Sequence, residues 1–354
     1  MLNSLIPIAA AFRRAANKHY DNAGLQFVDV PEMVGITGAC ENVDTLFRIG
    51  NRNGLPLFFS QTGQLTLEQA LQFVPGVYTT MISGRDEECE DDRHLRQFML
   101  TEEEFTWPMV TGNTTTPYDE EKMYEALLQH IESAAKAMIR GVLTDCGEHI
   151  ANNWNRDVNA MKDSMNLPFH RISYDDAVTL VQQNGMPEVG WGDDLTSGHE
   201  AKVVEVLNAG QFPRPVLIMK YPKDIKFFNM KVSEADPRVV LSADCVFPFS
   251  GEGTGSAVRE HDGNKLEQRL LGSTMYRLHT ERGGTLADFG WYLDMVKSGR
   301  TQPHAGYGIG NERVIQYILG QKDIRNCSVL SQLSAKTGDW ELAKAQHAFN
   351  VASA

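Results

Sequence analysis

An acidic stretch with basic residues at both ends, GRDEECEDDRHLRQF at residues 84–98, has side chains that could bind a nucleoside triphosphate. Arg85 stands before the acids, and Arg93 and His94 follow them. A guanidinium group can bind a phosphate or a carboxylate through two parallel hydrogen bonds. The separated basic groups could therefore hold opposite ends of a triphosphate. The alternative is a solvated hairpin loop, which is the usual role of a charge run.

Two further residues of this stretch suit the base of a nucleotide. Glu87 can accept a hydrogen bond from a purine amine, and the ring of Phe98 offers a face for stacking. We expect the acids between Arg85 and Arg93 to keep the loop mobile and solvated until the nucleotide arrives. Together these residues indicate ATP, provided that other parts of the chain contribute.

A second constellation lies in SADCVFPFSGEGTGSAVRE, residues 242–260, where a glycine-rich bend separates the carboxylates of Asp244 and Glu252. Mg²⁺ takes one or two protein carboxylates and completes its coordination with phosphate oxygens and water. The pair therefore predicts a magnesium site beside a triphosphate. The alternative is a β-bulge that carries surface acids.

A third constellation, GYGIGNERV at residues 306–314, combines glycines with an arginine. It differs from the dinucleotide fingerprint G-x-G-x-x-G, because Glu312 stands where the last glycine should be. The glycines, Gly310 among them, instead let the backbone approach a flat ligand closely. Arg313, at the start of a predicted helix, can stack on a base and reach a terminal phosphate.

The composition argues against some functions. The chain has 354 residues, 42% of them hydrophobic, and a net charge of −13, whereas extended nucleic-acid or anionic-membrane surfaces need clustered Lys and Arg. The five cysteines lack metal-ligand spacing, which favours reduced thiols in the cytosol. We find no signal-peptide pattern and no run of the roughly 18 apolar residues that span a bilayer. We therefore expect a cytoplasmic protein without membrane contact.

The first constellation must lie at the tip of a long hairpin, because strand-like runs at residues 76–85 and 94–107 flank it. Further strands are expected at residues 25–31, 55–60, 215–222, 227–232 and 238–249. Helices are expected at residues 5–24, 64–74, 118–147, 148–162, 173–185, 262–281 and 286–299, with another that begins after Gly310. This order predicts an α+β fold with a mostly antiparallel central sheet flanked by helices. We expect one catalytic domain at residues 1–335 and a helical tail at 336–354.

The three arginine-bearing segments, in this order, resemble the three motifs of class II aminoacyl-tRNA synthetases. FRRAANKHYDNAGLQFVDVPEM, which contains Pro31, resembles motif one, a helix and strand at a dimer interface. Residues 82–105 resemble motif two, and residues 306–314 resemble motif three. FSQTGQLTLE, RISYDDA, WGDDL and YPKDIKFFNMK are similar to the asparaginyl branch of the aspartyl/asparaginyl subgroup. The resemblance covers residues 10–330 and implies the class II synthetase fold.

The resemblance also implies roles for individual residues. ATP would be bound by Arg85, Glu87, Arg93, His94, Phe98, Gly310 and Arg313, Mg²⁺ by Asp244 and Glu252, and the amino acid by Thr62, Gln64, Glu102 and Arg259. Arg85 and Arg313 would be the catalytic residues. The implied reaction is in-line attack of a carboxylate on the α-phosphate, with catalysis by positioning and charge neutralisation.

The sequence departs from the family pattern in four places. Motif one starts near residue 10, which leaves no room for the N-terminal OB-fold that binds the anticodon. Motif two has Gly84 and Gln97 where phenylalanine and glutamate are usual. Ser-Ala-Val replaces the usual Gly-Gly-Ser before Arg259, and Phe-Pro-Arg is missing after motif three. The ATP half is therefore largely kept, whereas the substrate and tRNA halves have changed.

We therefore expect an ATP-dependent adenylate-forming ligase that transfers an aspartate- or asparagine-like amino acid to ammonia or an amine, without tRNA. The alternatives are asparaginyl-tRNA synthetase-type aminoacylation, activation of the substrate's side chain, and a non-catalytic binding paralogue. Leu67, where aspartate-activating relatives place a lysine, favours asparagine, whereas Arg259 suits an anion, so both substrates stay open. We also expect a homodimer that forms through residues 10–31.

Overall fold

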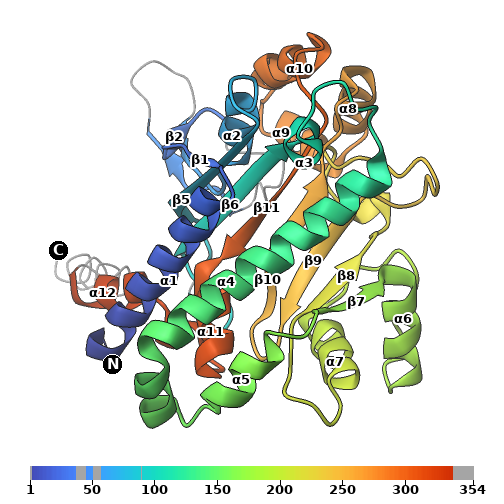
Figure 1. The fold of residues 1–354 in the computed structure, drawn as a ribbon. Helices are drawn as coiled ribbons and strands as arrows, with labels where there is room; N and C mark the ends of the chain where they lie inside the picture. The colour runs from blue at the N-terminus through green and yellow to red at the C-terminus, as the bar shows by residue number, and fades with distance from the viewer. Residues whose placement is uncertain (1, 37–44, 51–56, 89, 338–354) are drawn as a thin grey trace, which may run out of the picture.

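A computed structural model describes residues 2–36, 45–50, 57–88 and 90–337 of the chain. Its centre is an eight-stranded sheet (Figure 1). In spatial order the strands are β1 (Gln26–Phe27), β5 (Gly76–Gly84), β6 (Gln97–Thr106), β11 (His304–Gly310), β10 (Gly251–Val258), β9 (Ser242–Phe247), β8 (Val216–Met219) and β7 (His170–Ser173). The outermost pairs, β1–β5 and β7–β8, are parallel, and the pairs between them are antiparallel. The predicted α+β fold with a mostly antiparallel sheet is therefore confirmed.

Helices flank this sheet, and a small sheet lies beside it. The helices are α1 (Leu2–Asn22), α2 (Gln64–Ala70), α3 (Trp107–Thr111), α4 (Glu120–Trp154), α5 (Val158–Ser164), α6 (Tyr174–Gln183), α7 (Ser197–Leu207), α8 (Gly263–Leu271), α9 (Thr274–Glu281), α10 (Gly290–Lys297), α11 (Asn311–Leu319) and α12 (Val329–Thr337). Short 3-10 turns are η2 (Lys223–Ile225), η3 (Leu286–Phe289) and η4 (Ile324–Cys327). The small sheet has the order β2 (Met33–Val34), β4 (Leu57–Phe59) and β3 (Arg48–Ile49).

Two long helices, α1 and α4, lie side by side across one face of the large sheet (Figure 1). Leu5, Ile8 and Phe12 recur at helical spacing on α1 and are buried. The buried side chains of both helices belong to one hydrophobic cluster with residues of β6, β9 and β11. This layer supports the middle of the sheet from behind and leaves the opposite face for a site.

The hairpin of β5 and β6 is confirmed, with Gly84 opposite Gln97 at its tip and Gly76 opposite Phe105 at its base. Its second strand begins at Gln97 rather than at His94. The bend predicted between Asp244 and Glu252 is the turn that joins β9 to β10, and the glycine-rich segments themselves are the strands β10 and β11. A reason is visible at Gly306, where a Cβ atom would lie 2.1 Å from the carboxyl carbon of Glu104. Glycine there makes room for a side chain that extends over the neighbouring strand.

Four helix predictions are wrong in their boundaries. Residues 118–147 and 148–162 were predicted as two helices, but α4 runs on to Trp154 and ends at Asn155, whose φ is +51°. Residues 262–281 form α8 and α9, because the hydroxyl of Ser273 caps a new helix. Residues 286–299 begin as a 3-10 turn before α10.

The strands predicted at 25–31 and 238–249 are shorter than expected, as β1 and β9. The strand predicted at 227–232 is wrong, because this segment makes isolated bridges instead of a ladder. The Arg269 side chain donates to the carbonyl oxygens of Phe227 and Met230, which a strand neighbour would otherwise occupy. The predicted tail boundary at residue 335 falls inside α12, and residues 338–354 lie outside the described part of the chain.

Candidate active site

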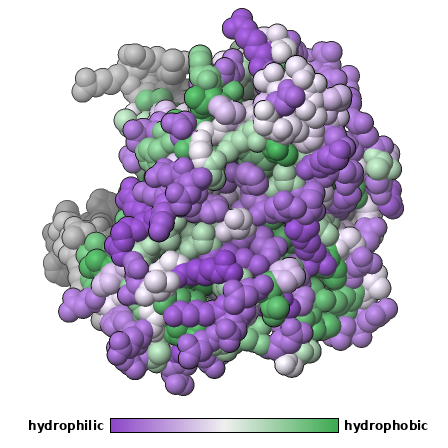
Figure 2. All heavy atoms as spheres, viewed as in Figure 1, coloured by the Kyte–Doolittle hydropathy of each residue, from purple (hydrophilic) through white to green (hydrophobic). Residues whose placement is uncertain are grey.

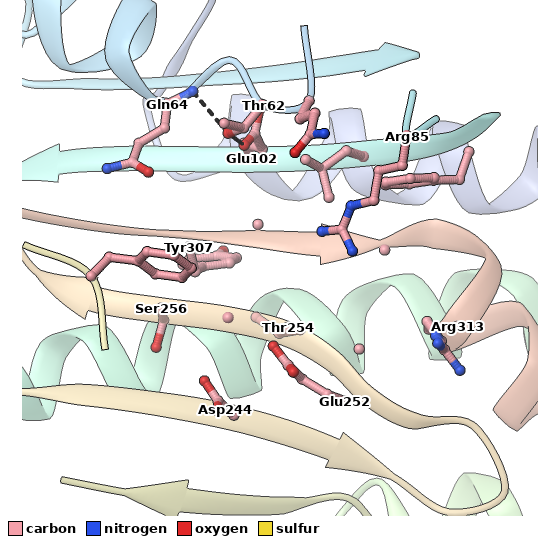
Figure 3. Close-up of a pocket in the computed structure, with 18 of the residues that line it drawn as sticks. Thr62, Gln64, Arg85, Glu102, Asp244, Glu252, Thr254, Ser256, Tyr307 and Arg313 are labelled. Carbon is pink, nitrogen blue, oxygen red and sulfur yellow. Dashed lines mark hydrogen bonds between the residues drawn. The ribbon is translucent and has the colours of Figure 1, made fainter. Parts of the chain in front are cut away.

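The candidate site is a cavity of about 580 Å³ on the face of the sheet opposite α1 and α4. Glu102 and Glu104 of β6 line this cavity, whereas Glu103 between them hydrogen-bonds to His130 of α4. Successive side chains of a strand point to opposite faces, so the cavity and the two long helices lie on opposite sides of the sheet. Strands β6, β11, β10 and β9 form its floor, and Figure 3 shows residues from these strands around the opening.

All thirteen residues predicted to bind a ligand line this one cavity. They are Thr62, Gln64, Arg85, Glu87, Arg93, His94, Phe98, Glu102, Asp244, Glu252, Arg259, Gly310 and Arg313. The β5–β6 hairpin, the start of α2, strands β9 and β10 and the β11–α11 junction supply most of them. The fold therefore brings together residues that are far apart in the sequence, while their individual ligand roles stay predictions.

The basic end of the cavity is formed by the hairpin and the start of α11. The guanidinium carbon of Arg85 lies 5.7 Å from the centre of the Phe98 ring. Arg313 donates to two backbone carbonyl oxygens, that of Ser250 and, at 2.7 Å, that of Arg93. Burial and the charge of Arg93 lower the pKa of Arg313. These contacts hold Arg313 in the wall of the cavity (Figure 3), and Phe98 lines the same cavity.

Two acids of the hairpin loop, Asp86 and Asp91, form hydrogen bonds within the loop, while the mobility expected of the loop stays a prediction. The carboxylate of Asp91 accepts from the backbone amides of Arg93 and His94 at 2.7 Å each, and it lies 3.0 Å from the His94 ring. Asp86 pairs with Arg96 at 2.6 Å. Of the basic residues after the acids, Arg93 and His94 line the cavity, whereas Arg96 is held by the loop itself. Asp86 thus holds Arg96 within the loop, while Arg93 and His94 lie in the wall of the cavity.

At the acidic end, Asp244 and Glu252 lie on the paired strands β9 and β10, and Glu200 of α7 joins them. Lys226 contacts Asp244 at 2.5 Å. The charge of Asp244, followed by burial, raises the pKa of Glu252 to about 7. Burial, followed by the charges of Glu252 and Asp244, raises the pKa of Glu200 to about 8. Lys226 thus pairs with Asp244, whereas the charges of Arg85 and Arg313 act on Glu252 and that of Arg93 acts on Glu200.

This set of groups fits Mg²⁺ bound together with a polyphosphate. Within residues 2–36, 45–50, 57–88 and 90–337, no three or more His, Cys, Asp or Glu side chains converge closely enough to hold a metal ion by themselves. Magnesium does not need such a cage, because it keeps several waters and shares phosphate oxygens. The mutual repulsion of Asp244, Glu252 and Glu200 is what a cation would relieve.

Glu102 occupies the part of the cavity predicted to hold an α-amino group. Its carboxylate accepts from the Thr62 hydroxyl and, at 2.6 Å, from the backbone amide of Gly63. The backbone amide of Gln64 in turn donates to the Thr62 hydroxyl at 3.1 Å (Figure 3). Burial raises the pKa of Glu102 to about 7, although these hydrogen bonds oppose the shift. An ammonium group placed here would pair with the charged form of the carboxylate.

Arg259 lies at the far end of this part of the cavity and is already paired. Its Nη2 atom donates to Glu104 at 2.5 Å, and its Nε atom lies 4.0 Å from the carboxylate of Glu68. The side chains of all three residues are at most 5% exposed. Arg259 therefore presents a guanidinium and the carboxylate of Glu104 side by side to a ligand.

Four residues at the two ends were missed by the sequence analysis, namely Glu68, Glu104, Glu200 and Lys226. Glu104 could have been found, because it stands two residues after Glu102 on the same strand and therefore on the same face. Glu68 lies one turn after Gln64 on α2, but it faces away from the cavity, whereas Glu200 lies on α7, far from the other site residues in sequence. No local pattern connects those helices to β9 or β10.

The face of the molecule that carries α1 and α4 is largely hydrophilic, with hydrophobic areas that are separated from one another (Figure 2). Within the described residues, every helix is too short or too polar to cross a membrane.

Comparison with known proteins places this geometry in a family. The sequence model of one protein family, the class II tRNA synthetases (D, K and N), matches residues 2–334. The asparagine–tRNA ligase of Thermococcus gammatolerans is 31% identical over 323 residues, which cover 91% of this chain and 67% of that protein. The asparagine–tRNA ligase of Pyrococcus furiosus is 34% identical over 302 residues, or 85% of this chain and 62% of that protein. The chain thus spans about two thirds of the length of these relatives or less.

Solved structures agree with the sequence relatives. The crystal structure of asparaginyl-tRNA synthetase from Pyrococcus horikoshii complexed with asparaginyl-adenylate superposes with a TM-score of 0.78 at 31% identity. The match covers 92% of this chain and 68% of that one. The asparaginyl-tRNA synthetase of Entamoeba histolytica shares the fold, with a TM-score of 0.73 at 22% identity.

Proposed function

The chain belongs to the class II tRNA synthetases (D, K and N), and from this premise we propose that it activates asparagine with ATP. The products of this step are asparaginyl-adenylate and pyrophosphate. The relative from Pyrococcus horikoshii that was solved with asparaginyl-adenylate matches 92% of this chain, which supports the proposal. The cavity offers a basic wall, an acidic floor and an amino-acid end in one enclosure, as such a reaction requires.

In the proposed reaction an oxygen of the α-carboxylate attacks the α-phosphorus, and the bond from that phosphorus to the bridging oxygen breaks. Arg85 holds the carboxylate against the α-phosphate, while Arg93 and His94 contact the outer phosphates. Phe98 and Arg313 hold the base, Gly310 lets the backbone approach it, and Glu87 accepts from its amine. Mg²⁺ held by Asp244 and Glu252 would neutralise charge on the departing pyrophosphate. No protein nucleophile is needed.

The observation that carries asparagine as the substrate is the pairing of Arg259 with Glu104. A side-chain amide has an acceptor oxygen and a donor nitrogen, and this pair offers a donor guanidinium beside an acceptor carboxylate. The carboxylate of aspartate would instead lie against that of Glu104. Leu67 does not enter the choice directly, because it is fully buried in a separate apolar cluster.

For the acceptor, we propose tRNA, since the relatives described as asparagine–tRNA ligases favour that alternative over ammonia or an amine. The expectation of a non-tRNA acceptor has no comparable support. The two acceptors are distinguished by incubating the protein, ATP and labelled asparagine with tRNA or with ammonium. Acid-precipitable asparaginyl-tRNA is the expected product. Consumption of asparaginyl-adenylate by ammonium or an amine alone would instead support the stand-alone ligase.

The amino acid is tested first, by ATP–pyrophosphate exchange with asparagine and with aspartate. We expect exchange with asparagine and at least about a hundredfold less with aspartate, because a site with fixed buried polar groups rejects a mismatched one strongly. Equal exchange with both would contradict the role given to Glu104. Silence with every amino acid would favour a non-catalytic binding paralogue, and exchange that persists when the α-carboxylate is blocked would favour side-chain activation.

We also propose that two copies associate through residues 10–31. Strand β1 is the outermost strand of the large sheet in the described structure, and both of its residues are exposed. Such an edge can pair with a second strand, and Phe27, one of the two residues of β1, is 43% exposed. Light scattering should find a dimer that Phe27→Asp converts to monomer, while Leu271→Asp on α8 leaves it intact. A monomeric wild type would exclude this interface.

A further inference from the structure

A buried network of charged groups stands behind the cavity wall that carries Arg259. Glu68 of α2, Tyr292 of α10 and His304 of β11 do not line the cavity, and each is at most 1% exposed. The carboxylate of Glu68 accepts from Tyr292 at 2.8 Å and lies 3.1 Å from Nε2 of His304. These residues can affect a substrate only through the groups that do line the cavity.

The contacts of His304 require that its ring is protonated on both nitrogens. Its Nδ1 atom lies 2.8 Å from the carbonyl oxygen of Gln302, and its Nε2 atom lies 3.1 Å from the carboxylate of Glu68. With Glu68 ionised, as the nearby Arg259 favours, both partners are acceptors, so each ring nitrogen donates, and a neutral imidazole has a single donor. At 1% exposure the remaining nitrogen would find no water. The raised pKa of His304, to which the hydrogen bond and charge of Glu68 contribute against burial, is consistent with this assignment.

Glu68 connects this cation to the cavity. One of its oxygens accepts from Nε2 of Gln64 at 2.7 Å and faces Nε of Arg259 at 4.0 Å. Its other oxygen serves Tyr292 and His304. Burial by itself would raise the pKa of Glu68, but the hydrogen bond and charge of His304, followed by the charge of Arg259, lower it below the usual value. Glu68 is therefore an anion that touches two cavity-lining side chains from behind.

The four charges alternate in sign from the interior to the cavity: His304, Glu68, Arg259 and Glu104. Their sum is zero, and an uncompensated charge at this depth would be costly. We propose that Glu68 is a positioning residue that sets the preference for a neutral side chain, because it balances His304 and orients Arg259 and Gln64. This inference rests on the proposed activation of an amino acid in the same cavity.

The physical reason lies in what each substrate does to the balance. A side-chain amide adds no charge, so the sum stays at zero. The carboxylate of aspartate adds a negative charge beside Glu104, and His304 cannot take up a further proton to offset it, because it already carries both. Without the charge of Glu68 the site could hold one more positive charge, either permanently or through proton uptake by His304 when aspartate binds. The discrimination against aspartate should then fall.

The test compares Glu68→Gln with Glu103→Gln in ATP–pyrophosphate exchange with asparagine and aspartate. Glu103 is a matched control: it is equally buried, it also contacts a histidine and a tyrosine, and it lies on the opposite face of the sheet. For Glu68→Gln we expect the asparagine-to-aspartate ratio of kcat/KM to fall about tenfold or more, as one pKa unit of altered charge interaction implies. Glu103→Gln should keep the wild-type ratio. Equal losses for both amino acids in Glu68→Gln would overturn the inference.

A second variant and a second measurement guard against a misfolded protein or an inactive one. His304→Gln removes the positive charge of His304 and should strengthen the preference for a neutral side chain. The asparagine-to-aspartate ratio of kcat/KM should therefore rise. Nitrogen NMR shifts, assigned by comparison with this variant, should show two protonated ring nitrogens of His304 in the wild type and a neutral ring in ligand-free Glu68→Gln. If the wild type proves to be silent in exchange, the proposed function fails separately. The ratio of asparagine to aspartate binding, measured by calorimetry, then decides the inference, and an unchanged ratio in Glu68→Gln overturns it.

Discussion

The two ends of the cavity deal with buried charge in different ways. At the amino-acid end, Arg259 is paired with Glu104 at 2.5 Å, and Glu68 and His304 complete a balanced set behind it. At the end proposed to bind the phosphates, neighbouring carboxylates repel one another: the charge of Asp244 raises the pKa of Glu252 to about 7, and burial, followed by the charges of Glu252 and Asp244, raises that of Glu200 to about 8. Arg313 there donates to backbone carbonyl oxygens rather than to carboxylates.

The difference indicates what each end is prepared to receive. A balanced set with donor and acceptor side by side suits a small neutral group, because the group adds no charge and replaces no ion pair. A set of mutually repelling carboxylates suits ligands that bring their own charges, such as a polyphosphate together with a divalent cation. The amino-acid end is therefore formed in advance, whereas the phosphate end is completed by what binds.

The largest effect is expected from removing a positive charge at the phosphate end. Arg85→Ala should lower adenylate formation about 10²–10³-fold, the usual loss when one preorganised donor to a developing charge is removed. Arg238→Ala is a suitable control, because Arg238 is an exposed arginine paired with Asp236. ATP–pyrophosphate exchange measures both. Full activity in Arg85→Ala would mean that the ATP site is placed wrongly.

A smaller effect is expected from disturbing the preformed end without touching a charged residue. In Gly306→Ala the new methyl group would meet the carboxyl group of Glu104 at 2.1–2.3 Å and push it away from Arg259. Overpacking of this kind costs about 1–3 kcal/mol of unfolding free energy. In Gly308→Ala, on the same strand, the nearest atom lies at 3.4 Å, which is ordinary contact. Urea unfolding should therefore separate the two variants, and equal stability would show that Glu104 is free to move.

The smallest effect is expected in the pH dependence of the unfolding free energy, through Glu200. The pKa of Glu200 rises from 4.5 to about 8 in the folded protein, first through burial and then through Glu252 and Asp244. Between these values the folded protein holds a proton that the unfolded chain has lost, so stability falls as pH rises. Without nucleotide and metal, we expect this group to remove about 1–2 kcal/mol of unfolding free energy between pH 6 and pH 8.

Glu200→Gln should flatten this part of the stability profile, measured by urea unfolding at several pH values. Glu205→Gln on the same helix is the control, because Glu205 is an exposed residue paired with Lys202. Addition of Mg²⁺ and ATP should stabilise the wild type more at pH 8 than at pH 6, since the ionised carboxylates then have a cation to bind. A wild type and a Glu200→Gln variant with parallel profiles would contradict the repulsion among these carboxylates.

Much of the phosphate end could be predicted from the sequence, because its residues lie on short segments with strong local signals. Arg85 and Arg93 flank the tip of one hairpin, and Arg313 follows a run of glycines at the start of a helix. The predicted fold class was confirmed for the same reason, because it follows from runs with a period of two and from helix caps, which are local signals. The strands β10 and β11 were not among the predicted strands, because they are rich in glycine, and a glycine such as Gly306 makes room for a neighbouring side chain that only the fold identifies.

What the sequence determined by itself was the set of chemical groups and the hairpin that presents some of them. What only the tertiary structure decided was their charge balance. Glu68 and His304 are 236 residues apart and meet at 3.1 Å, because α2 packs against β6, the strand beside β11. Whether an arginine recognises an anion or a neutral amide depends on such neighbours. For Arg259, the carboxylates of Glu104 and Glu68 decide this, and only the folded chain brings both of them to the same guanidinium group.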